Sequence, residues 1–187
     1  MTIISHGQIT LLTFAIKYLK KGFLLSRIKH MLNYHSRKLY FFAHIQSSID
    51  YASTIWDNCS DINLKPLRSL HRRSLKLILS KNKIKPKDYQ NANILPLSER
   101  LKFNKGLTMF KCLKSVAPEN LKNIFSSKNT RDQSKLYIPL PRIDLFKTSF
   151  KFSGAFLWNN LPLAVKNSKS VHCFKRNYFA NLLKAPD

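Results

Sequence analysis

Residues 63–79 read NLKPLRSLHRRSLKLIL and predict an amphipathic helix. Pro66 falls in its first turn, where a missing backbone N–H costs little. When the helix is projected at about 100° per residue, its cations share an arc of about 140° and four apolar side chains lie opposite. The cations are Lys65, Arg68, Arg72, Arg73 and Lys76, and the apolar residues are Leu67, Leu70, Leu77 and Ile78. This pattern indicates one face that packs against the protein and one that meets solvent or a polyanion.

Helical periodicity dominates on either side of this segment as well. A helix is expected over residues 36–56, with one apolar stripe made of Phe42, Ile45, Ile49, Ala52 and Trp56. Residues 98–115 are apolar nearly all round, which predicts a central helix, and Ser170 is placed to cap a further helix beginning at residue 171. Only four glycines occur in 187 residues. The predicted fold class is mainly α, with an irregular or extended segment near 136–150.

Two polar stretches divide the chain. Residues 81–92 hold four lysines, a proline and few apolar side chains, which is typical of a connector. Residues 126–135, SSKNTRDQSK, contain no apolar side chain and predict a loop. We therefore expect an N-terminal helical part over residues 1–80, a basic connector over 81–92 and a C-terminal helical part over 93–187.

The charge balance restricts the class of partner. The chain carries 33 Lys and Arg against 9 Asp and Glu, a net charge of +24 and a pI near 10.3. Such an excess disfavours an ordinary enzyme of small metabolites and points to nucleic acid or an anionic membrane surface. No run is long and apolar enough to predict a membrane-spanning helix. A basic helix face is often only solvated, but with so few acids we favour RNA and/or DNA, contacted through backbone phosphates, and no membrane.

Residues for catalysis or metal binding form no recognisable pattern. The six histidines are scattered, the nine acids are mostly isolated, and no Asp-Asp pair or glycine-rich phosphate-binding motif occurs. Asp50 falls within a helical stripe and is expected to make hydrogen bonds rather than bind a metal. Three widely separated cysteines, Cys59, Cys112 and Cys173, predict free thiols in a reducing compartment. The sequence predicts no catalytic site, no metal site and no cofactor.

Four blocks, in order, resemble one family. They are HIQSSIDYASTIWDNCS at 44–60, LRSLHRRSLKLIL at 67–79, LPLSERL at 95–101 with KCL at 111–113 and APENL at 117–121, and SF with SGA, LWNNLP and FKR between 149 and 176. Together they are similar to the C-terminal part of reverse transcriptases from jockey-like non-LTR (LINE-type) retrotransposons. The resemblance covers about residues 27–184.

The resemblance implies a helical, thumb-like bundle that packs beside a primer–template duplex and holds its backbone. The polymerase palm, with its aromatic-Ala-Asp-Asp turn and magnesium, and the endonuclease module would lie upstream of Met1. On this interpretation the chain derives from an RNA-directed DNA polymerase but has no catalytic activity alone. The five cations of 63–79 are then the expected nucleic-acid-binding residues.

Other interpretations stay open at this point. A small basic structural RNA-associated protein of ribosomal type would also have this pI, and residues 1–49 contain no acid. A pseudogene-like product would owe its charge to ancestry alone. An acid-free, basic N-terminus is typical of a mitochondrial presequence too. The unbroken amphipathic pattern favours the nucleus or cytoplasm over the mitochondrion.

Overall fold

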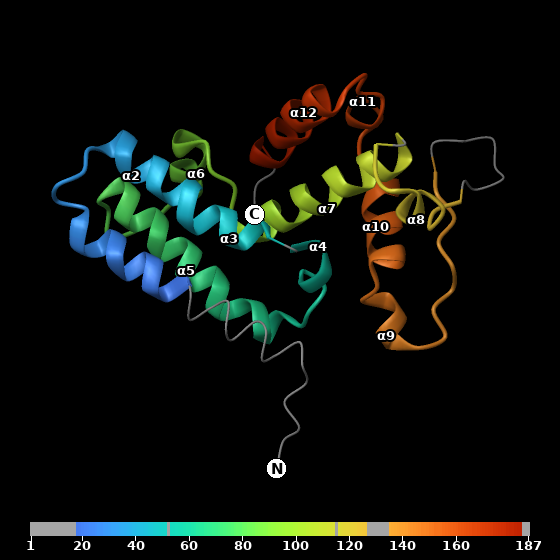
Figure 1. Cartoon of the computed structure of the whole chain (residues 1–187), viewed down its shortest axis with the longest axis horizontal. Coiled ribbons are helices and arrows are strands. Elements are labelled where there is room, and N and C mark those ends of the chain that lie inside the picture. The colour runs from blue at the N-terminus through green and yellow to red at the C-terminus, as the bar shows by residue number, and fades with distance from the viewer. Residues whose placement is uncertain (1–17, 52, 115, 127–134, 185–187) are drawn as a thin grey trace, which may run out of the picture. The chain divides into compact units, whose positions relative to one another are not determined.

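The computed structural model describes residues 18–51, 53–114, 116–126 and 135–184, and it is mainly helical (Figure 1). The predicted mainly α fold is therefore confirmed. The described residues fall into two compact units that divide between Ser98 and Glu99. Residues 81–92, which we expected to be a connector, contain a helix and belong to the first unit.

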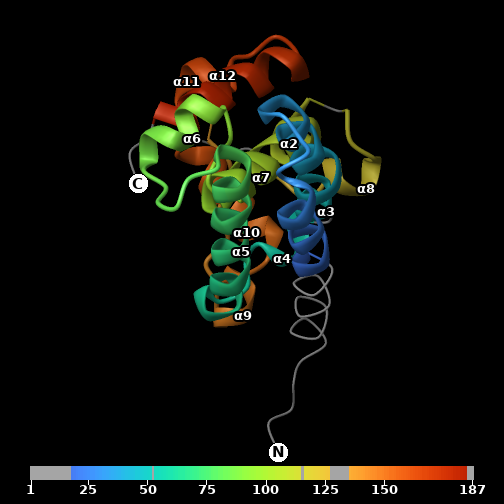
Figure 2. The same cartoon turned by 90° about the vertical axis from the view of Figure 1, so that its left-hand side faces the viewer.

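The first unit consists of a helical segment over residues 18–28 followed by short and long helices. Residues 18–28 run alongside the long helix α5 in both views (Figures 1 and 2). The elements that follow are α2 (Tyr34–Tyr40), the π-helix η1 (Phe41–Gln46), α3 (Ser47–Asp50), α4 (Ser53–Trp56), α5 (Asp61–Leu79) and α6 (Pro86–Ala92).

The core of the first unit lies between residues 18–28, η1 and α5. Its most deeply buried apolar side chains are Leu25, Phe41, Ile45, Leu75 and Ile78. Tyr18 is also buried, and its hydroxyl lies 3.3 Å from Ser74 Oγ. Burial raises the pKa of the Tyr18 hydroxyl, so this group stays a neutral hydrogen-bonding partner. A hydrogen bond and apolar packing therefore join residues 18–28 to α5.

The helix expected over residues 36–56 is interrupted, and its predicted stripe is partly wrong. Phe41 is fully buried, whereas Phe42 is 38% exposed. Four of the buried positions are spaced by four residues, at Phe41, Ile45, Ile49 and Ser53, and Gln46 is buried next to Ile45. In a regular α-helix of 3.6 residues per turn, side chains four residues apart would point in progressively different directions. The π-helix η1 has more residues per turn, so it keeps these side chains on the buried side. Tyr51 then adopts an extended conformation and ends α3.

The predicted burial of Trp56, the last member of that stripe, is also only partly correct. Its side chain is half-buried, and its indole N–H donates to the backbone carbonyl of Tyr51 at 3.2 Å. Asp50 accepts a hydrogen bond from Gln46 Nε2 at 2.9 Å, in line with the hydrogen-bonding role expected for it.

The second unit is built on α7, along which most residues are buried or half-buried, as expected for the central helix predicted at 98–115. Two pairs of aromatic side chains connect it to a later helix: Phe110 stacks on Phe174 at 4.4 Å between ring centroids, and Phe103 stacks on Tyr178 at 5.8 Å. Its helices are α7 (Leu97–Leu113), α8 (Glu119–Lys122), α9 (Asp144–Lys147), α10 (Phe150–Asn159), α11 (Leu163–Lys166) and α12 (Val171–Lys184).

Two glycines allow α7, α10 and α12 to approach closely. A Cβ atom at Gly106 of α7 would lie 2.5 Å from Cε1 of Tyr178, and one at Gly154 of α10 would lie 2.7 Å from Sδ of Met109. Trp158 is buried against Phe110 and Phe174. The three helices therefore share one aromatic core, with α7 at its centre.

The remaining predictions for the second unit are confirmed in part. Residues 136–143 are irregular as expected, but α9 and the start of α10 fall within the segment expected to be extended. Ser170 caps α12, because its hydroxyl accepts from the backbone N–H of Cys173 at 3.2 Å. Most of the loop expected at 126–135 lies outside the described residues. Within the described part of the chain, no helix is both long and apolar enough to cross a bilayer.

Candidate nucleic-acid interface

The five predicted cations all lie on α5 and point away from the core. Lys65, Arg68, Arg72 and Arg73 are exposed, and Lys76 is half-buried. The structure therefore brings these residues together along one face of a helix that begins two residues earlier than expected, at Asp61.

The buried face of α5 is rotated relative to the prediction. Leu67 and Ile78 are buried as expected, but Leu70 and Leu77 are only half-buried. Leu64, His71, Ser74 and Leu75 take their place in the core. His71 packs edge-on against Phe41, with ring centroids 5.6 Å apart. Leu70 and Leu77 are left at the edge of the helix, next to the cations.

Two of the five cations are engaged within the protein. Arg68 forms an ion pair of 2.6 Å with Asp61, and both side chains are solvent-exposed. Arg72 donates to the backbone carbonyl of Ile84 at 3.2 Å and so ties α5 to the segment before α6. Among the described residues, Lys65, Arg73 and Lys76 have no such partner. These three are the cations of α5 that remain open to an external anion.

A basic pocket extends this surface at the C-terminal end of α5. Its volume is about 460 Å³, and the four cations that line it are Lys29, Arg73, Lys76 and Lys81. Among the described residues that line it there is no Asp or Glu, and His30, Ser80 and Asn82 add polar groups. We refer to it as the basic pocket.

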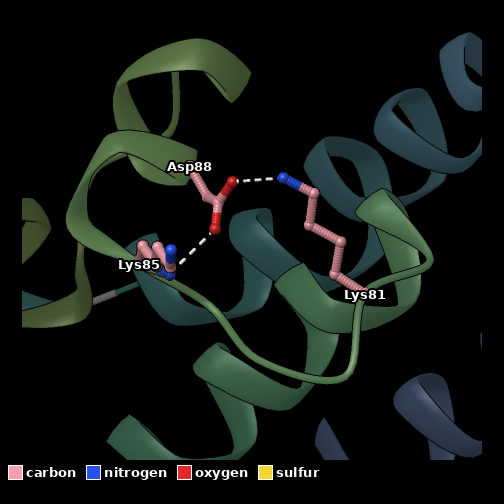
Figure 3. A network of polar contacts seen from close by, with 3 residues as sticks. All are labelled: Lys81, Lys85 and Asp88. Carbon is pink, nitrogen blue, oxygen red and sulfur yellow. Dashed lines mark hydrogen bonds and ion pairs between the residues drawn. The ribbon is translucent and has the colours of Figure 1, made fainter.

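Lys81 is the one cation of the basic pocket with an acidic partner in the described residues (Figure 3). Its ammonium lies 2.5 Å from Oδ1 of Asp88, whose Oδ2 accepts from the Lys85 backbone N–H at 2.8 Å. Asp88 thereby caps the first turn of α6. The Lys81 ammonium and then the Lys85 N–H lower the pKa of the Asp88 carboxyl, so this acid is ionised and holds Lys81 in place.

Arg37 of α2 makes hydrogen bonds to the C-terminal end of α5, beside the basic pocket. Its guanidinium donates to the backbone carbonyl of Leu77 at 3.3 Å and to the hydroxyl of Ser80. Ser80 has a left-handed conformation, with φ 52°, and ends the helix. Arg37 therefore satisfies a free carbonyl at the helix end.

Sequence reasoning missed Lys29 and Lys81, because neither lies on the helix that carries the other cations. They come from the ends of two different segments, and only the folding of residues 18–28 against α5 brings them to one pocket. A weak signal existed, since a Lys beyond the end of a predicted helix is placed near its carbonyls. It does not reveal which other cations lie nearby.

Metal-ligating side chains form no cluster in the described part of the chain. No three His, Cys, Asp or Glu side chains there come together as a metal site. Burial raises the pKa of the Cys59 and Cys112 thiols, which keeps them protonated and weakly nucleophilic.

No family model, curated protein sequence or solved structure matches the chain.

Proposed function

We propose that this chain binds nucleic acid through backbone phosphates, as a helical module related to the C-terminal, thumb-side region of non-LTR retrotransposon reverse transcriptases. The observation that carries the proposal is the open cationic surface of α5, formed by Lys65, Arg73 and Lys76 and continued into the basic pocket.

The surplus of charge on the first unit exceeds what the fold itself requires. Residues 18–98 contain fifteen Lys and Arg but four Asp and Glu. A helix C-terminus carries roughly half a negative charge, so the ends of residues 18–28 and α5 offset about one cation. Asp88 offsets Lys81. About two uncompensated charges thus remain in the basic pocket alone, and a phosphate chain supplies anions at the required density.

The resemblance to the retrotransposon family supports the proposal through packing residues. Trp158 and Phe174, from the blocks LWNNLP and FKR, both belong to the aromatic core of the second unit. Leu95, Leu97 and Leu101, from the block LPLSERL, are buried as well. A shared fold would preserve the apolar residues that form its core, and these blocks contain such residues. The resemblance therefore supports a shared fold, whereas the cations support an anionic partner.

The decisive experiment compares salt dependence in two variants of equal charge. The test variant carries Lys65→Gln, Arg73→Gln and Lys76→Gln. The control carries Lys151→Gln, Lys175→Gln and Arg176→Gln, three exposed cations of the second unit. Fluorescence anisotropy with a labelled duplex at several salt concentrations gives the slope of log affinity against log salt. Three lost phosphate contacts should flatten that slope by about 2 to 3 in the test variant.

The control variant separates contact from net charge. Both variants lose three charges, so a change caused by net charge alone would flatten both slopes equally. Circular dichroism establishes that each variant retains the native helix content. Equal slopes for the two variants would remove α5 from the binding surface, and a wild-type chain without measurable affinity at low salt would contradict the proposal altogether.

A further inference from the structure

A groove with an apolar lining runs between residues 18–28 and α5. Its volume is about 440 Å³, within the range of about 300–1,000 Å³ typical of small-molecule sites. Leu19, Gly22 and Phe23 line one side, and Leu70, Arg73 and Leu77 line the other. Leu70 and Leu77 are the two α5 leucines that the core leaves half-buried. We refer to this feature as the apolar groove.

Phe23 gives the apolar groove an aromatic wall that is open to solvent. Its side chain is 60% exposed. The Arg27 guanidinium lies over its ring, 4.8 Å from the centroid. Arg27 occupies one face of the ring, which leaves the other face for a flat ligand.

The apolar groove and the basic pocket adjoin, because Arg73 and Leu77 line both. A ligand that spanned them would place a flat, weakly polar part against Phe23 and an anionic part among Lys29, Arg73 and Lys76. A nucleotide has this distribution of properties. An apolar peptide would leave the cations unpaired, and a simple anion would leave the groove unfilled.

We propose that the apolar groove and the basic pocket together bind one unpaired nucleotide of a single strand, with the base stacked on Phe23 and the phosphate held by Lys29, Arg73 and Lys76. This inference rests on the proposed function and specifies the state of the strand. A base within a duplex is paired and stacked, so it enters the groove only after it leaves the helix. Duplexes therefore contact the cations of α5 without using the groove.

The test fills the groove without changing charge. A Cβ atom at Gly22 would meet nothing within 4 Å, so Gly22→Leu projects a side chain into the groove, and Gly22→Ala is the matched control that leaves it largely open. Phe23→Ala removes the stacking surface instead. The probes are a single-stranded oligodeoxynucleotide carrying 2-aminopurine and an unmodified duplex of the same length. Anisotropy measures both affinities, and 2-aminopurine fluorescence reports stacking.

Gly22→Leu and Phe23→Ala should each weaken single-strand binding about tenfold, as expected for one lost base–aromatic stack. Both should also abolish the quenching of 2-aminopurine and leave duplex affinity within about twofold of the wild type. Gly22→Ala should behave like the wild type. Circular dichroism and thermal midpoints confirm that the variants fold.

Four outcomes would overturn the inference. If both variants keep wild-type affinity for the single strand, the groove does not hold a base, although duplex binding would still support the proposed function. If single-strand and duplex binding fall together, the groove does not distinguish strand state. If Gly22→Leu changes the oligomeric state in light scattering and leaves oligonucleotide binding unchanged, the groove holds a second copy of the chain. A wild-type chain that binds neither probe contradicts the proposed function as well.

Discussion

The side-chain amide of Asn159 pairs with both backbone groups of Leu136. Its Oδ1 accepts from the Leu136 N–H at 2.8 Å, and its Nδ2 donates to the Leu136 carbonyl at 3.0 Å. One side chain at the end of α10 thus replaces a strand partner for an irregular segment that has few regular hydrogen bonds of its own. The Asn159 carbonyl in turn accepts from the buried Lys166 ammonium at 3.1 Å.

Replacement of Asn159 should therefore destabilise the second unit. Asn159→Ala removes both hydrogen bonds and leaves the Leu136 backbone groups without these partners, which should cost about 1–3 kcal/mol. Asn160→Ala is the matched control, because Asn160 is exposed and ends α10 through its backbone N–H. Urea denaturation followed by circular dichroism compares the two. Equal stability of the two variants would show that the Asn159 amide does not hold Leu136.

Gly106 should tolerate no side chain, even though alanine favours helices. The Cβ atom of Gly106→Ala would lie 2.5 Å from Tyr178, which is 1% exposed and donates its hydroxyl to the Lys102 carbonyl at 3.2 Å. Since the ring has no space to move, we expect a loss of about 1–3 kcal/mol. Gly22→Ala, with open space around the added methyl group, should instead stabilise the chain by about 0.5–1 kcal/mol. Thermal and urea denaturation measure both changes.

The two tryptophans should differ in their contribution to stability. Trp158 is buried beside Phe110 and Phe174, so Trp158→Ala should cost about 3–5 kcal/mol. Trp56 is half-buried, and Trp56→Ala should cost clearly less. Each tryptophan can be observed alone in a single-tryptophan variant. Acrylamide should quench Trp56 in the folded Trp158→Phe variant more readily than Trp158 in the folded Trp56→Phe variant. Equal quenching in the two variants would contradict this assignment.

The cationic face of α5 was predictable because residue type and helical period agree over its whole length. Its buried face was not fully predictable, because the projection of a single helix contains no information on the elements that pack against it. Ser74 is in the core since its hydroxyl donates to the Leu70 carbonyl at 3.1 Å and meets Tyr18, a residue 56 positions away. Phe41 is buried instead of Phe42 because the π-helical turn has a different number of residues per turn and so changes which side chains face the core.

The basic pocket and the apolar groove lay beyond sequence reasoning for the same physical reason. Each is made by two segments that meet only in the folded chain, and Arg73 belongs to both. Periodicity places Arg73 on an exposed face but not beside Phe23 or Lys29. Charge and composition could therefore predict the kind of partner, whereas the shape of the site depends on tertiary packing.

Asp88 should make the stability of the first unit depend on pH. Its pKa is lowered by the Lys81 ammonium and the Lys85 N–H, so in the folded protein the carboxylate is favoured over the acid. A group with a lowered folded-state pKa stabilises the fold above its unfolded pKa, which is about 3.9 for Asp. That contribution is lost as the pH falls through the folded-state value.

Asp88→Asn keeps the size of the side chain but cannot ionise. The variant should therefore have a lower thermal midpoint than the wild type at pH 7, and the difference should shrink as the pH falls below about 3.9. Asp61→Asn is the control, because it removes the same charge from an exposed ion pair that contributes little. Thermal denaturation of the three proteins across this pH range gives the comparison. A difference between Asp88→Asn and wild type that stays constant down to pH 2 would show that the carboxylate charge does not stabilise the contact between Lys81 and α6.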